Sequence, residues 1–91
     1  MDIQMKMVSG ASRVLFFLKN NPQAIDEEIY QDLSDYITEE GIKNELLIRG
    51  MIASASKAVK LKRSNDIITE KQILKEVVDA IPQMTLEIEN N

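Results

Sequence analysis

The sequence predicts an all-α, four-helix bundle-like domain with a long central third helix and a short flexible C-terminal tail. Apolar residues recur at steps of three and four in four separate segments, as they do on one face of an α-helix. Three of these segments begin with residues that commonly cap helices. The 91 residues are 44% hydrophobic, enough for one core and too few for two domains. We therefore expect a helical domain over residues 1–82 and a tail over residues 83–91.

The first helix is expected to run from about Ile3 to Lys19. Its apolar stripe consists of Ile3, Met7, Ala11, Val14 and Leu18. Gly10 lies in the middle of this segment, where it costs about 1 kcal/mol relative to alanine. Pro22 disfavours helical geometry in the residue before it, so the helix should end near Asn20.

The second and third helices are expected to meet at Thr38. Asp26 is the predicted N-cap of the second helix, whose stripe consists of Ile25, Ile29, Leu33 and Ile37. Thr38 can break the helix and cap the next one, although one continuous helix through Thr38 is an alternative. The third helix would then reach about Arg63, roughly 36 Å for about 24 residues. Its apolar residues spread widely around its axis, which indicates contacts on more than one side.

The fourth helix has the clearest start signal in the chain. Thr69 and Gln72 match the capping-box pattern, and Pro82 is expected to end the helix. The stripe between them consists of Ile73, Leu74, Val77, Val78 and Ile81. Beyond Pro82, apolar residues alternate with polar ones as in a strand. The tail is therefore interpreted either as disordered coil or as a strand that a partner or a second copy would order.

The composition excludes the commonest catalytic and metal-binding chemistries. The chain has no Cys and no His, so disulfides, thiolate or imidazole metal sites and a Ser-His-Asp triad are all excluded. Its three glycines are isolated and form no phosphate-binding loop. We expect no catalytic residue, no cofactor and no bound metal. The carboxylates of Glu28, Asp32 and Asp35 share one helical face, but they match no calcium-loop spacing and are interpreted as solvated.

Charge and hydropathy set expectations about partners. The net charge of -4 argues against a free-standing nucleic-acid binder. The longest apolar run, Val14–Leu18, is far shorter than the ~20 residues of a membrane span. The first residues also lack the pattern of a secretory signal. We therefore expect a cytoplasmic protein with no membrane partner.

The basic half of the third helix is a candidate partner surface, formed by Lys57, Lys60, Lys62 and Arg63. These cations could complement the helix dipole or pair with the acidic second helix. They could also bind phosphate or an acidic partner. Single-stranded nucleic-acid binding would favour aromatic residues among these cations, and there are none.

Two further features are candidate contact sites. Gly50, Ser54 and Ala58 are spaced by four and form a nearly flat face, suited either to helix packing within the chain or to a dimer seam. Phe16 and Phe17 are adjacent, so their side chains leave a helix about 100° apart. Either both lie in the core, or one is exposed and anchors a partner.

Part of the chain resembles the end of a histone-fold protein. Ala58–Leu61, Asp66–Ile68 and Thr69–Glu70 are similar to the long helix, second loop and last helix of that fold. Ile37–Glu40 is similar to the start of the long helix. However, the long helix is a turn or more too short, an extra helix precedes the match, and the chain is acidic. No DNA-binding residue is therefore carried over, and no family is assigned.

These observations predict a non-catalytic protein–protein interaction module. An adaptor, an inhibitor of the immunity or antitoxin kind, or an assembly subunit would all fit. The partner would be another protein or a second copy of the chain. The alternative is a transcription-associated or nucleic-acid-binding protein that uses the basic end of the third helix.

Overall fold

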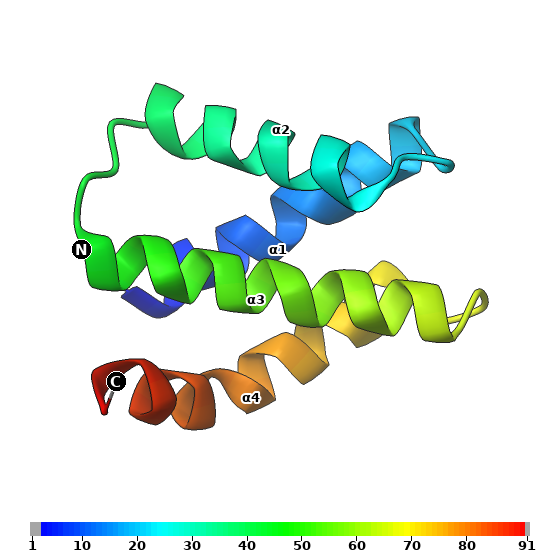
Figure 1. Cartoon of the computed structure of the whole chain (residues 1–91). Coiled ribbons are helices and arrows are strands. Elements are labelled where there is room, and N and C mark those ends of the chain that lie inside the picture. The colour runs from blue at the N-terminus through cyan, green and yellow to red at the C-terminus, as the bar shows by residue number, and fades with distance from the viewer. Residues whose placement is uncertain (1–2, 91) are drawn as a thin grey trace.

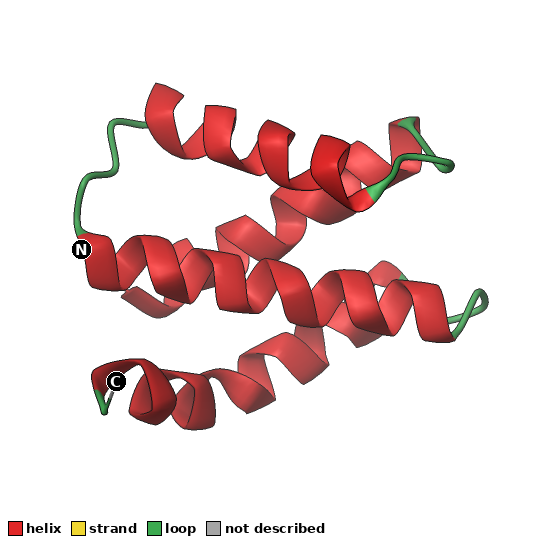
Figure 2. Ribbon diagram, in the orientation of Figure 1, coloured by secondary structure: helices red, strands yellow, loops and turns green. Residues whose placement is uncertain are grey.

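The computed structural model describes residues 3–90, and within this range every regular element is a helix (Figure 2). The helices are α1 (Ile3–Asn20), α2 (Asp26–Glu39), α3 (Glu45–Ser64) and α4 (Glu70–Glu89). The predicted all-α, four-helix fold is confirmed.

The four helices share one core but are not equivalent in their contacts. In Figure 1, α3 crosses the middle of the molecule with α2 above it and α4 below it, while α1 runs behind. α1 packs against all three other helices, whereas the main contacts of α3 are with α1 and α4. The centre of the fold is thus the crossing of α1 and α3, and α2 lies against α1.

The core is built from the predicted stripes. Its fully buried large side chains include Met7, Val14, Ile29, Leu33, Met51, Ile73 and Val77. Two members of the predicted stripes that lie at helix starts, Ile3 and Ile25, are exposed instead of buried. Val78, in the middle of α4, is exposed as well, so a stripe predicts the buried face of a helix better than it predicts the burial of each member.

The predicted break between the second and third helices exists, so the alternative of one continuous helix is wrong, but the break lies after Thr38 and not at it. α2 continues through Thr38 to Glu39. Gly41 then adopts a left-handed conformation with φ of 69°. The Gly41 amide donates to the Thr38 carbonyl at 3.0 Å, and the Ile42 amide donates to the Ile37 carbonyl at 3.2 Å. This is the Schellman pattern, in which a glycine just past the helix satisfies its last carbonyls.

The true cap of α3 lies after this turn. The Asn44 side chain accepts a hydrogen bond from the Leu47 amide at 3.1 Å. α3 therefore begins at Glu45 and has 20 residues, the same length as α4. Thr38 and Asn44 are both residues that could cap α3. Gly41 favours Asn44, because it ends α2 after Thr38 and leaves Asn44 at the start of α3.

The predicted stop at Pro82 is also wrong. The predicted flexible tail over residues 83–91 is wrong as far as Asn90, the last residue that the structure describes. α4 continues through Pro82 to Glu89, and Asn91 lies outside the described residues. Proline removes one backbone donor from a helix and usually bends or ends it. Here Ile81 before it is buried and Met84 after it packs against the core. Tertiary contacts on both sides of the proline thus hold the helix.

The other helix starts are close to those predicted. At Thr69 the capping box is confirmed: its hydroxyl accepts from the Gln72 amide at 3.1 Å, and its own amide donates to the Gln72 side chain at 2.9 Å. At α2 the N-cap is Ile25 rather than Asp26, and the Glu28 carboxylate accepts from the Ile25 amide at 3.0 Å.

Candidate interaction surfaces

The small-residue face of α3 packs inside the chain. Gly50, Ser54 and Ala58 are all buried, the last two completely. A Cβ placed on Gly50 would lie 2.9 Å from Cγ of Met7 on α1. The helix-packing role is thus observed for these residues, and the dimer seam stays a prediction.

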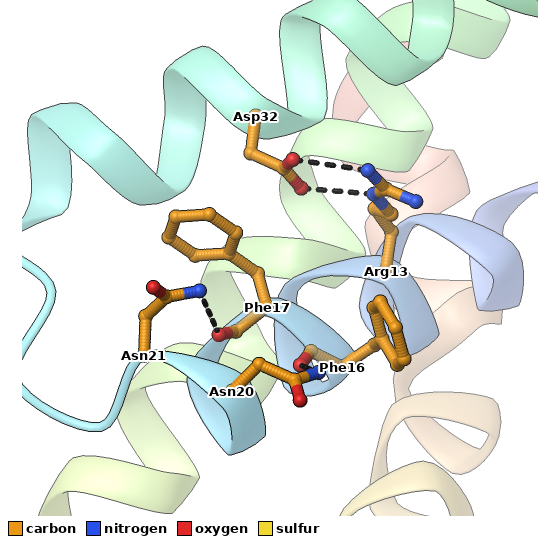
Figure 3. Close-up of polar contacts among 6 residues, drawn as sticks. All are labelled: Arg13, Phe16, Phe17, Asn20, Asn21 and Asp32. Atoms are coloured by element: carbon orange, nitrogen blue, oxygen red, sulfur yellow. Dashed lines mark hydrogen bonds and ion pairs between the residues drawn. The ribbon is translucent and has the colours of Figure 1, made fainter.

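The two phenylalanines point to different sides of α1 (Figure 3). Phe17 is half-buried and packs against the core, while the Phe16 side chain is 58% exposed. Two side-chain amides stabilise the C-terminal end of α1, which follows the two phenylalanines. Asn20 donates to the Phe16 carbonyl at 2.9 Å, and Asn21 donates to the Phe17 carbonyl at 3.0 Å. The alternative with one exposed aromatic is therefore the one observed.

Arg13 lies beside the exposed ring and is held from α2. Its Nε and Nη2 donate to the two carboxylate oxygens of Asp32 at 2.8 and 3.0 Å (Figure 3). Its guanidinium carbon is 5.9 Å from the centre of the Phe16 ring and 5.2 Å from that of Tyr36. The hydrogen bond to Asp32 raises the pKa of Arg13 further above its usual value. The guanidinium is therefore charged, held in one orientation and close to two aromatic rings.

Sequence reasoning missed Arg13, Asp32 and Tyr36 as members of this cluster. The three-residue spacing of Arg13 and Phe16 does place them on one helical face. The contribution of α2, however, depends on how α1 and α2 cross, which neither segment reveals alone.

Arg13, Phe16 and Tyr36 border a shallow hollow on the outer side of α1, which we call the α1 surface. It has a volume of about 540 Å³ and is lined by Met5, Val8, Ser9, Ser12, Arg13, Phe16 and Tyr36. Met5 at its far end is 69% exposed. The α1 surface therefore carries two large exposed apolar side chains and a fixed arginine.

The predicted basic surface is divided among different sides of α3. Lys57 and Lys62 are five residues apart, which separates them by about 140° around the helix. Lys62 and Arg63 border a hollow beside the turn that follows α1. Arg63 pairs with Asp26 of α2 at 3.1 Å and donates to the Ala24 carbonyl at 3.0 Å. Internal pairing with the acidic second helix is thus observed for Arg63.

Lys60 and Arg63 border a different concavity, which we call the α2–α3 groove. It has a volume of about 830 Å³ and is lined by Asp26, Tyr30, Ile52, Ser56, Val59, Lys60, Arg63 and Ser64. The hydroxyls of Tyr30 and Ser56 bridge the two helices at 3.0 Å. Ile52, which the sequence suggested only as one of many apolar positions, is 43% exposed here.

A third concavity lies where the start of α1, the start of α3 and the end of α4 meet. It has a volume of about 330 Å³ and a mostly apolar lining of Ile3, Met7, Asn44, Leu46, Leu47, Gly50, Thr85, Ile88 and Glu89. Thr85 and Ile88 belong to the segment expected to be a tail, so this concavity exists because α4 continues past Pro82.

Other kinds of site find little support among residues 3–90. No three acidic side chains in this range gather closely enough to hold a metal ion, and both carboxylate oxygens of Asp32 are bonded to Arg13. None of the helices described combines the length and apolarity needed to cross a membrane. The chain matches no known protein-family model, no curated protein and no solved structure.

Proposed function

We propose that this chain is a non-catalytic interaction module that binds another protein through the α1 surface. The observation that carries the proposal is Phe16, an aromatic side chain that is 58% exposed beside an oriented arginine. Aromatic residues and arginine are enriched at protein interfaces, where a few side chains carry most of the binding energy. Phe16 and Met5 are both exposed apolar side chains that line the same hollow, and a large exposed apolar patch commonly marks such an interface.

The arrangement around Arg13 supports a binding role for a second reason. Its two hydrogen bonds to Asp32 fix the side chain before any partner arrives. Ordering a long side chain on binding costs about 0.5–1.5 kcal/mol, and a fixed side chain avoids much of that cost. Within the same hollow, the Ser12 hydroxyl would hydrogen-bond a partner's backbone, whereas the Ser9 hydroxyl already donates to the Lys6 carbonyl at 2.6 Å and would only accept.

The non-catalytic part of the proposal is supported by composition and shape. The chain has no His or Cys to act as an acid, base or nucleophile near neutral pH. The α1 surface is shallow and open, so a substrate there would stay in water instead of in a desolvated site.

The proposal is tested by affinity capture from the cell in which the chain occurs, with three forms of the full chain. The wild type, Phe16→Ser and Leu86→Ser serve as baits, and Leu86 is the matched control because it is an apolar residue of similar exposure on α4. We expect a protein that the wild type and Leu86→Ser retain and that Phe16→Ser loses. If Phe16→Ser retains the same proteins as the wild type, the α1 surface is not the binding site.

A second copy of the chain is the other partner to test. Sedimentation of the wild type over a wide range of concentrations would show a mass near 10.3 kDa if the partner is a different protein. A concentration-dependent mass that Phe16→Ser abolishes would instead identify the α1 surface as a homodimer interface.

Nucleic-acid binding is the alternative function. It is favoured by Lys57, Lys60 and Lys62, which form no ion pair within the described part of the chain. Their spread around α3 disfavours it. Binding to duplex or single-stranded DNA that weakens steeply with salt, and that charge reversal of Lys60 and Arg63 abolishes, would support this alternative. No binding at low salt would exclude it.

A further inference from the structure

We propose that the α2–α3 groove is a second binding surface, which accepts an amphipathic helix with an apolar ridge and an acidic flank from a partner protein. The groove lies between α2 and α3 and shares no lining residue with the α1 surface. The inference therefore stands whether or not the α1 surface binds a protein.

The groove exists because α2 and α3 are both attached to α1 but make little backbone contact with each other. The contacts that span it are polar: Tyr30 to Ser56 at 3.0 Å, and Asp26 to Arg63 at 3.1 Å. Val59 lies between these contacts but is buried, whereas Ile52, one turn before Ser56, is 43% exposed. The apolar surface that the walls of the groove leave uncovered is therefore mainly that of Ile52.

The dimensions suit a helix. On α3 the lining residues Ile52, Ser56, Val59 and Arg63 follow each other at steps of three and four, so they form one continuous face. From Ile52 to Arg63 this face is about 16 Å long at 1.5 Å per residue, which matches about three turns of an accompanying helix. Helices that bind in grooves present their anchors at the same spacing.

The charges select the kind of helix. The lining holds two cations, Lys60 and Arg63, and one carboxylate, Asp26, which is already paired with Arg63. Lys60 is exposed and has no ion-pair partner in the described residues. The groove is thus locally positive on a chain whose net charge is -4. Complementary charge favours acidic occupants and disfavours basic ones.

The inference is tested with the full chain and two synthetic helical peptides. Both peptides carry the same leucine ridge, and the flanks are glutamate in one and lysine in the other. Fluorescence anisotropy measures the affinity of each at low and at moderate salt. We expect the glutamate peptide to bind at least tenfold more tightly than the lysine peptide, with a difference that shrinks as salt screens the charges.

Variants of the chain locate the site. Lys60→Glu and Ile52→Ser should each weaken the glutamate peptide about tenfold, because one removes the charge and the other the apolar contact. Lys71→Glu and Leu86→Ser are matched controls on α4, since both residues are exposed and neither lines the groove. Lys60→Gln provides a milder change should the charge reversal disturb folding, which circular dichroism reports.

Several results would overturn the inference. These are equal affinity for the two peptides, no saturable binding of the glutamate peptide, or an equal loss in the α4 controls. A loss with Phe16→Ser but not with Ile52→Ser would move the site to the α1 surface. A duplex oligonucleotide that binds more tightly than the glutamate peptide, and depends on Lys60, would assign the groove to nucleic acid instead.

Discussion

Gly10 of α1 lies directly against the backbone of Met51 of α3. A Cβ placed on Gly10 would be 2.6 Å from the Met51 carbonyl oxygen and 3.1 Å from its Cα. No side chain larger than hydrogen fits there without moving one helix. This contact explains why glycine is found in the middle of α1 despite its low helix propensity, and it fixes how closely the two central helices approach.

Replacing Gly10 with alanine should lower the free energy of unfolding by up to about 2 kcal/mol. Overpacking a core costs about 1–3 kcal/mol, and the gain of about 1 kcal/mol in helix propensity offsets part of that cost. Urea unfolding followed by circular dichroism measures the change. Gly50→Ala is the matched control: its Cβ would meet the flexible Met7 side chain, 2.9 Å away, so we expect a smaller loss. Equal stability of the Gly10 variant and the wild type would contradict the close contact.

Ser54→Ala should stabilise the protein by about 1 kcal/mol. The Ser54 hydroxyl is fully buried and has no hydrogen-bond partner in the described structure. A buried polar group without a partner costs about 1–3 kcal/mol, and alanine removes that cost with little change of volume. Ser56→Ala serves as the contrast, because its hydroxyl bonds to Tyr30 and its loss should be destabilising. A bulky Ser54→Leu change should also destabilise, since the site is closed. Thermal unfolding distinguishes all three, and a lower melting temperature for Ser54→Ala would refute the prediction.

The Arg13–Asp32 pair should contribute about 1 kcal/mol to stability. It is bidentate, and the Arg13 and Asp32 side chains are 33% and 18% exposed, so solvent screens it less than an ordinary surface pair. Arg13→Gln, Asp32→Asn and the double variant form a double-mutant cycle. We expect the effects of the single changes to add up to more than the effect of the double change. Strict additivity would show that the two side chains do not interact.

Pro82→Ala should raise stability by up to about 3 kcal/mol, because proline in a helix interior is less favourable than alanine by that amount. The expected result follows from α4 continuing through Pro82 to Glu89. Chemical denaturation gives the free energy, and the helical circular dichroism signal should stay the same or rise slightly. If residues 83–89 were coil, the substitution would leave stability nearly unchanged, so this measurement also checks the end of α4.

Local signals in the sequence predicted the helices well, and failed where a distant contact or a competing local signal decides. The capping box at Thr69 and the stripes of α1, α2 and α4 depend on neighbours three or four residues away, and they were predicted from those neighbours alone. Pro82 was misread because Met84 contacts a core assembled from other helices. The predicted helix boundary at Thr38 was wrong, because Gly41 provides a better end for α2 and Asn44 a better cap for α3 than Thr38 does.

The candidate surfaces were predictable only in part, for the same reason. Phe16 was recognised as one of an adjacent pair, but its exposure and its pairing with Arg13 follow from how α1 and α2 cross. Lys60 and Arg63 were recognised by charge, whereas Ile52 and Tyr30 join them only once α2 and α3 are placed. Residue type thus predicts which side chains can bind, and helix packing determines which of them meet.

The contacts of α1 also constrain how the chain reaches this structure during synthesis. α1 is made first, yet Met7, Ala11 and Val14 are buried by helices that follow it. About 44 residues separate the end of α1 from the end of α3, which takes a ribosome roughly 2–9 s at typical rates of elongation. Throughout that interval the apolar face of α1 has at most α2 to cover it. A nascent chain of this protein therefore keeps an exposed apolar helix face until α3 has been synthesised.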